Sequence, residues 1–168
     1  MPRSFATSLR TLASLIAVLA LVSAVGCAKK TKPEDSSIPN SANADDNSSG
    51  DSDSGKAMGL QTIHFPYDAF TLAGEAKDQL KANAEILKGH ANVKIQIEGH
   101  CDQRGGIQYN IALGEKRANA VKKFLQDQGV SEDRFATVSL GKERPVDQGT
   151  TEEAYAKNRR ANFVITSK

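Results

Sequence analysis

Most of the residue types that build catalytic and metal centres are scarce in this sequence of 168 residues. It has no tryptophan, two cysteines and three histidines. The histidines, at positions 64, 90 and 100, include no i,i+4 pair, and the cysteines, at positions 27 and 101, lie far apart. Zinc sites combine closely spaced ligands of these two types, so the sequence predicts no metal site.

A long apolar run and an excess of basic charge are also absent. The apolar stretch Leu12–Val25 is shorter than the ~20 residues that a helix needs to cross a bilayer. Its basic start and small-residue end are typical of a secretory signal peptide, which we predict for residues 1–26; an uncleaved N-terminal anchor is the alternative. Residues 1–26 hold two arginines and no acid, so without them the formal charge of +2 falls to zero and does not favour a nucleic-acid partner.

Residues 28–58 have the composition of a linker. They are rich in Ser, Asn, Asp, Gly and Pro and contain no aromatic residue. Such a segment cannot bury enough apolar surface to offset the entropy of ordering it. We therefore predict a disordered linker over residues 27–58, with a mean span of roughly 30 Å, followed by one folded domain over residues 59–168.

Hydrophobic periodicity predicts an α/β fold for that domain. Alternating residues indicate strands at 60–65, 93–98, 135–139 and 161–165, and apolar residues spaced by three and four indicate helices at 72–88, 108–128 and 151–158. Because the strands alternate rather than run continuously apolar, one sheet face is expected to be solvated. The predicted fold is an α+β two-layer sandwich in βαβαβαβ order, with about four strands and the helices on one face.

The stretch EGHCDQRG, residues 98–105, contains three residue types of a thiol hydrolase. Neighbouring strand residues point to opposite faces of a sheet, so the side chains of His100 and Cys101 are expected to diverge. Cys101 is therefore interpreted as a small buried residue rather than a nucleophile. Asp102 follows the strand, where it can either stabilise a turn or bind a ligand.

The helix after this loop carries a second stripe of residues beside its apolar one. Asn110, Leu113, Gly114 and Arg117 lie on one face, and Gly114 costs the helix about 1 kcal/mol relative to Ala, so something is expected to approach closely there. Arg117 and Asp102 can border one groove. There they would either bind the carboxylate and the ammonium of a zwitterion or pair with each other, and the spacing does not decide between these alternatives.

Five segments, from Ile63 to Ile165, resemble the OmpA-like peptidoglycan-binding domain family in their order and spacing. The segments are FPYD, EGHCDQRG, YNIALGEKRA, SLGKERP and AYAKNRRANFVI, and the second and third lie within IEGHCDQRGGIQYNIALGEKRANAVKKFL. The resemblance implies non-covalent binding of the diaminopimelate stem peptide of peptidoglycan, with no enzymatic activity and no cofactor.

The resemblance also implies roles for particular residues. Asp102 is expected to bind the ammonium of diaminopimelate and Arg117 its carboxylate, with backbone groups around Cys101 adding hydrogen bonds. The supporting or bordering residues implied are Asn110, Tyr67, Asp68, Asn158 and Arg159. Cys101 stands where the family commonly has Ala or Thr, and Pro66 where it often has Asp or Gly.

Ala24-Val25-Gly26-Cys27 resembles a bacterial lipobox, with Ala24 at a position that is usually Leu. This resemblance implies lipidation of Cys27; the alternative for Cys27 is a disulfide with Cys101. The residue after Cys27, Ala28, is not Asp, which implies that the lipoprotein lies in the outer membrane with its domain in the periplasm. The resemblance also implies a TolB-like periplasmic partner and a role in envelope integrity and division. The alternatives are a wall anchor outside the Tol system and a flagellar stator component, which the absence of an acid in residues 1–26 disfavours.

Overall fold

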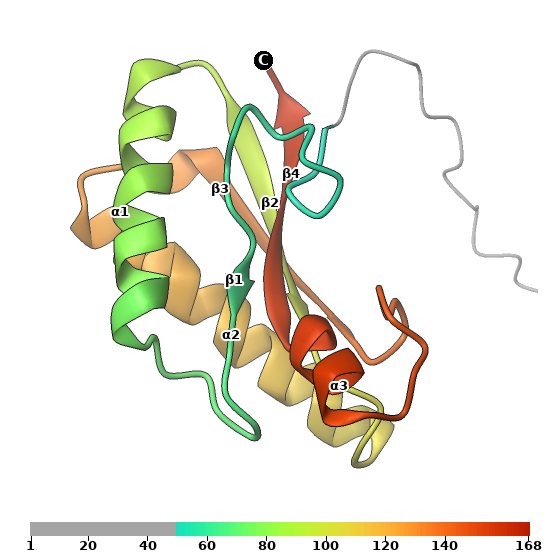
Figure 1. Cartoon of the computed structure of the whole chain (residues 1–168). Helices are drawn as coiled ribbons and strands as arrows, with labels where there is room; N and C mark the ends of the chain where they lie inside the picture. Colours follow the sequence, from blue (N-terminus) through green and yellow to red (C-terminus); the bar gives the residue numbers. More distant parts are fainter. Residues whose placement is uncertain (1–49) are drawn as a thin grey trace, which may run out of the picture. The chain divides into compact units, whose positions relative to one another are not determined.

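The sheet is built around β2 (Lys94–His100) in the computed structural model, which describes residues 50–168. β2 pairs in parallel with β3 (Phe135–Gly141) and antiparallel with β4 (Arg160–Ser167), and β4 pairs antiparallel with β1 (Ile63–His64). The strand order is therefore β1-β4-β2-β3 (Figure 1). This confirms the predicted four-stranded sheet.

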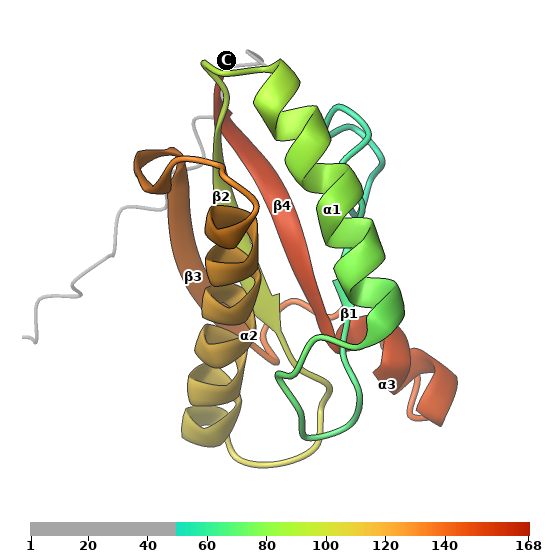
Figure 2. The same cartoon turned by 90° about the vertical axis from the view of Figure 1, so that its left-hand side faces the viewer.

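Two long helices cover one face of that sheet. Figure 2 looks onto α1 (Gly74–Gly89) and α2 (Ile107–Asp127), with the sheet behind them. A 3-10 turn, η1 (Glu132–Arg134), precedes β3, and α3 (Glu152–Asn158) precedes β4. The element order confirms the predicted two-layer fold. No helix within residues 50–168 is both long enough and apolar enough to cross a membrane.

The core forms where the alternating strand residues meet the apolar stripes of the helices. Ile95 and Ile97 of β2 are opposite Ile165 and Phe163 of β4, and all four are at most 1% exposed. The core residues extend from Ala57 to Ile165. These residues share one hydrophobic core, which is the property that allows a domain to fold by itself.

The first predicted strand is shorter than expected, with two residues in place of six. The main-chain N–H of Gln61 donates to Oδ1 of Asn83 at 2.8 Å, and Nδ2 of Asn83 donates to the Gln61 carbonyl at 2.8 Å. An α1 side chain thus takes both main-chain groups that a strand neighbour would use. α1 begins at Gly74 rather than at the predicted residue 72.

The predicted linker boundary was wrong, because residues 50–58 pack against the sheet. The main-chain N–H of Ser52 donates to the Phe163 carbonyl at 2.9 Å, and the N–H of Ile165 donates to the Gly50 carbonyl at 3.0 Å. Ala57 is fully buried. The composition of this segment is that of a linker, but β4 offers an unpaired edge there, and its hydrogen bonds order the polar chain. The rest of the predicted linker and signal peptide lies outside the described residues.

The face of the sheet opposite the helices is less solvated than predicted. Glu98, His100, Arg160 and Asn162 lie on it and are at most 9% exposed. Nε of Arg160 donates to Asp53 at 2.7 Å, and Oδ1 of Asn162 accepts from Ser52 Oγ at 2.7 Å. The segment that follows Gly50 therefore covers polar residues that the alternation alone placed in water.

The close approach predicted at Gly114 is that of the sheet to α2. A Cβ on Gly114 would lie 2.3 Å from Ser139 Oγ and 2.7 Å from the Gly99 carbonyl oxygen. A Cβ on Gly99 would lie 1.9 Å from the Gly114 carbonyl oxygen. This contact between two glycines lets α2 lie directly on β2 and brings the α2 side chains to the end of that strand.

Candidate ligand pocket at the end of β2

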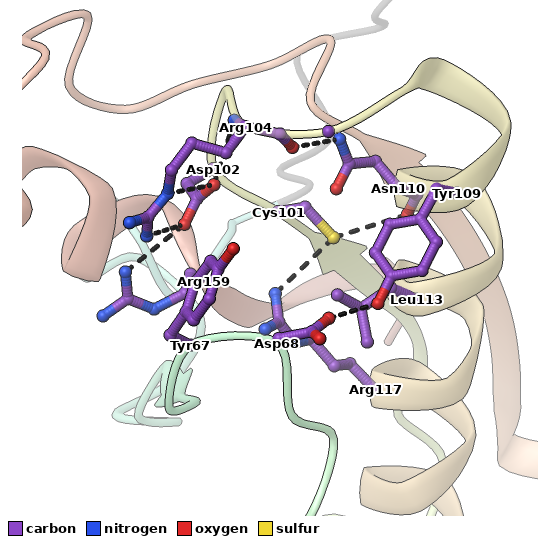
Figure 3. Close-up of a pocket in the computed structure, with 11 residues that line it drawn as sticks. Tyr67, Asp68, Cys101, Asp102, Arg104, Tyr109, Asn110, Leu113, Arg117 and Arg159 are labelled. Carbon is purple, nitrogen blue, oxygen red and sulfur yellow. Dashed lines mark hydrogen bonds and ion pairs between the residues drawn. The ribbon is translucent and has the colours of Figure 1, made fainter.

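A pocket of about 200 Å³ opens where β2 ends (Figure 3). Its walls come from the loop between β2 and α2, the loop between β1 and α1, the first half of α2 and the end of α3. Seven of the eight predicted site residues line it, namely Tyr67, Asp68, Cys101, Asp102, Asn110, Arg117 and Arg159. The structure thus brings together residues that are up to 92 positions apart in the sequence.

Arg117 is the largest fully buried side chain of the described residues, with 0% of its surface exposed. Its Nε donates to the Ala69 carbonyl at 2.9 Å, its Nη1 to the His100 carbonyl at 2.7 Å and its Nη2 to the Pro66 carbonyl at 3.2 Å. Among residues 50–168 it makes no ion pair with a carboxylate. Burial lowers the pKa of the guanidinium, but an arginine remains charged at neutral pH. The pocket wall therefore contains a buried cation whose hydrogen-bond partners are all neutral, namely three main-chain carbonyls and the thiol of Cys101.

Asp102 is paired with two other arginines, so the predicted alternative in which it pairs with Arg117 was wrong. Asp102 is only 5% exposed, and its carboxylate contacts Arg104 Nη2 at 2.6 Å and Arg159 Nη1 at 3.3 Å. Burial alone would raise the pKa of Asp102, but hydrogen bonds from the side chain and main chain of Arg104, and from Arg159, hold that pKa below its ordinary value. Asp102 is therefore an anion at neutral pH.

Arg104 is a pocket residue that the sequence analysis did not single out. Its guanidinium carbon lies 4.2 Å from the ring centroid of Tyr67 and 4.5 Å from that of Tyr155, and its Nη1 contacts Glu152 at 3.1 Å. The residue falls in a short polar run that reads as a turn. Asp102 lies only two residues before it, but Tyr67, Tyr155 and Glu152 are far away in the chain, so no local pattern could reveal those partners.

Cys101 is a buried, neutral thiol, as predicted. It is 3% exposed, its Sγ donates to the Asn110 carbonyl at 3.3 Å, and burial raises its pKa. His100 lies on the opposite sheet face, where its Nε2 is 3.5 Å from Glu98. No hydrogen bond joins the thiol to a histidine within residues 50–168, so the strand geometry rules out a Cys101–His100 pair.

The remaining predicted residues divide between the pocket and a neighbouring loop. Asn110 donates from Nδ2 to the Arg104 carbonyl at 2.8 Å and so holds the loop between β2 and α2. Tyr67 is 61% exposed at the rim, and Asp68 accepts a hydrogen bond from the hydroxyl of Tyr109, which is 54% exposed. Asn158 is not part of the lining, because its amide binds the main chain of residues 146 and 147.

Fold and pocket together define an OmpA-like α/β domain with a small, charged ligand pocket. The model of the OmpA family matches residues 64–159, more than half of the sequence. The chain belongs to this family, and the resemblance drawn from its motifs is confirmed.

Several similar proteins are peptidoglycan-associated lipoproteins. The chain is 43% identical to that of Legionella pneumophila over 115 residues, which span 68% of this chain and 65% of the relative. It is 38% identical to that of Pseudomonas putida over 152 residues, which span 86% of this chain and 91% of the relative. The match therefore covers less than two thirds of the Legionella protein but most of the Pseudomonas putida protein.

Solved structures show the same fold. The crystal structure of the peptidoglycan-associated lipoprotein from Burkholderia pseudomallei is 40% identical with a TM-score of 0.60, covering 62% of this chain and 88% of that one. The C-terminal domain of Helicobacter pylori MotB is 22% identical with a TM-score of 0.59, covering 63% of this chain and 84% of that one. At that identity the second likeness shows the fold alone.

Proposed function

We propose that this protein binds diaminopimelate-containing peptidoglycan without changing it and so attaches the outer membrane to the cell wall. The observation that carries the proposal is the buried Arg117, a cation in the pocket wall that has no carboxylate partner among residues 50–168. Its relatives named peptidoglycan-associated lipoproteins support the same ligand.

Arg117 has the capacity to bind a carboxylate of the ligand. A guanidinium carries five N–H donors. In Arg117 the Nε–H donates to the Ala69 carbonyl, and the two N–H groups of Nη1 donate to the His100 carbonyl and the Cys101 thiol. Nη2 donates only to the Pro66 carbonyl. One Nη2–H is left for a ligand, and a hydrogen bond between two charged groups is about twice as strong as a neutral one.

Asp102 supplies the opposite charge in the same pocket. Diaminopimelate carries an ammonium and a carboxylate on one carbon at its distal end, so Asp102 binds the first and Arg117 the second. Asn110 holds the loop between β2 and α2, and Arg159 holds the carboxylate of Asp102. Tyr67 and Asp68 border the ligand at the rim of the pocket. No nucleophile or cofactor is required for such binding.

The chain reaches the membrane through Cys27, which carries acyl chains, with residues 1–26 as its removed signal peptide. Two or more acyl chains are enough for stable anchoring. The domain then lies in the periplasm, where a TolB-like protein is its partner in envelope constriction during division. Incorporation of labelled palmitate into the wild type but not into Cys27→Ala tests the anchor, and co-purification with TolB distinguishes this role from a wall anchor outside the Tol system.

Calorimetric titration of residues 28–168 with a diaminopimelate-containing tripeptide tests the ligand. Asp102→Ala is expected to lose roughly 2–5 kcal/mol of binding free energy, because it removes one partner of a desolvated charge pair. Asp78→Ala, an exposed aspartate on α1, is the matched control and should bind like the wild type. A peptide with lysine in place of diaminopimelate lacks the distal carboxylate and should bind much more weakly. Equal binding of both peptides, or no binding to the wild type, contradicts the proposal.

A further inference from the structure

Asp102 has no hydrogen-bond position left for a ligand in this structure. A carboxylate accepts about four hydrogen bonds. Its Oδ1 accepts from the main-chain N–H of Arg104 at 3.1 Å and from Nε of Arg104 at 3.2 Å. Its Oδ2 accepts from Nη2 of Arg104 at 2.6 Å and from Nη1 of Arg159 at 3.3 Å. An ammonium group can therefore bind Asp102 only if one of these donors leaves.

Arg104 is the donor that is best placed to leave. Its side chain is 34% exposed, whereas that of Arg159 is 8% exposed and is also fixed by the Phe65 carbonyl, 3.1 Å from Nε. Asp102 lies in the protein interior with a side chain only 6% exposed. Arg104 thus connects a buried carboxylate to the pocket opening.

A second carboxylate is already in contact with Arg104. Glu152, whose side chain is 59% exposed, contacts Nη1 of Arg104 at 3.1 Å through one carboxylate oxygen and Nη1 of Arg159 at 2.8 Å through the other. The rings of Tyr67 and Tyr155 lie within 4.5 Å of the guanidinium carbon and hold it near both acids through cation–π contacts. A small rotation can therefore release Asp102 while Arg104 keeps an acidic and an aromatic partner.

We propose that Arg104 occupies the place on Asp102 that the ligand's ammonium group takes, and that ligand binding transfers its guanidinium to Glu152. The inference rests on the proposed function and deepens it, since it makes Arg104 the residue that sets the affinity for the ammonium. The exchange leaves no charge unpaired: the ligand cation replaces Arg104 at the buried acid, and the exposed acid retains Arg104. A neutral group cannot replace a cation there, so the pocket selects ligands with a free amino group.

The exchange predicts opposite effects for its two partners. Arg104→Gln removes the competitor and should bind the diaminopimelate tripeptide about tenfold more tightly, the factor expected if Asp102 is accessible in about a tenth of wild-type molecules. Glu152→Gln removes the acid that receives Arg104 and should weaken binding about threefold. In the double variant Glu152→Gln should have a smaller effect than in the wild type, because only its contact with Arg159 is then lost and residues that act as one unit are not additive.

Two peptides distinguish competition from other roles of Arg104. Calorimetry on residues 28–168 should show the gain of Arg104→Gln with the free tripeptide but not with the same peptide acetylated on its distal amino group. Arg144→Gln, an exposed arginine outside this pocket, should change neither. If Arg104→Gln weakens binding of both peptides, Arg104 is a direct ligand contact and the inference is wrong.

A simple amine tests the exchange without peptidoglycan. n-Butylammonium should shift the carboxyl ¹³C resonance of Asp102 at clearly lower concentration in Arg104→Gln than in the wild type. Equal shifts overturn the inference even if the peptide binds. A difference between the two proteins supports it even if neither binds the peptide, and in that case only the proposed function fails.

Discussion

Replacing Arg117 by methionine should lower the unfolding free energy of the domain even when no ligand is present. The side chain is fully buried and donates to three main-chain carbonyls, those of Pro66, Ala69 and His100. Two of these carbonyls belong to the loop between β1 and α1, and the third to the end of β2. One guanidinium therefore joins the loop between β1 and α1 to the end of β2, and both segments border the pocket.

The magnitude follows from those three carbonyls. A buried polar group left without its partner costs about 1–3 kcal/mol, so three of them cost roughly 3–9 kcal/mol. Removing a buried cation also returns several kcal/mol of desolvation free energy. Methionine approximately fills the volume, so the cavity contribution is small. The net loss expected for Arg117→Met is about 3 kcal/mol of unfolding free energy.

Urea and thermal denaturation of residues 28–168, followed by far-ultraviolet circular dichroism, measure this loss. At about 4 °C per kcal/mol for a domain of this size, Tm should fall by about 12 °C. Lys116→Met, at the exposed neighbouring position on α2, is the matched control and should change Tm little. If the unfolding free energy of Arg117→Met lies within about 1 kcal/mol of the wild-type value, the reasoning is refuted, because the guanidinium would then not stabilise the fold and its only role would be to bind a ligand.

Three further predictions concern packing, charge and a loop. Gly99→Ala should cost at least about 2 kcal/mol in urea unfolding, because its Cβ would overlap the Gly114 carbonyl, whereas Gly74→Ala meets no atom within 4 Å and should not destabilise. The pKa of Asp102 is lowered on folding. Its ionised form therefore contributes fully to the unfolding free energy above the unfolded pKa of about 3.9, and this contribution is lost as pH falls through the folded pKa. The difference in unfolding free energy between wild type and Asp102→Asn should narrow in acid titrations below about pH 4. Arg134→Ala should lose about 2 kcal/mol of unfolding free energy in thermal unfolding, because its side chain donates to the carbonyls of Leu87 in the last turn of α1 and of His90 and Val93 before β2.

The regular elements were predictable because their signals are local. Ile95 and Ile97 alternate with polar residues in β2, and Ala118, Val121 and Leu125 recur on one side of α2, so strand and helix follow from spacing alone. The two-layer architecture follows in turn, since each element has one apolar face to bury. The pocket could also be located, because most of its residues lie where β2 ends and α2 begins.

The fold class, the family and the place of the pocket at the end of β2 follow from periodicity and motif order, which are properties of the chain. The pairing of charges from distant segments depends on the tertiary structure. Asp102 meets Arg159 rather than Arg117 because the end of α3 reaches the pocket from a distant part of the chain, whereas its other partner, Arg104, is only two residues away. The polar residues from Gly50 onward pack on β4 for a similar reason. An ion pair or an edge hydrogen bond depends on where two segments meet in space, and no local pattern contains that information.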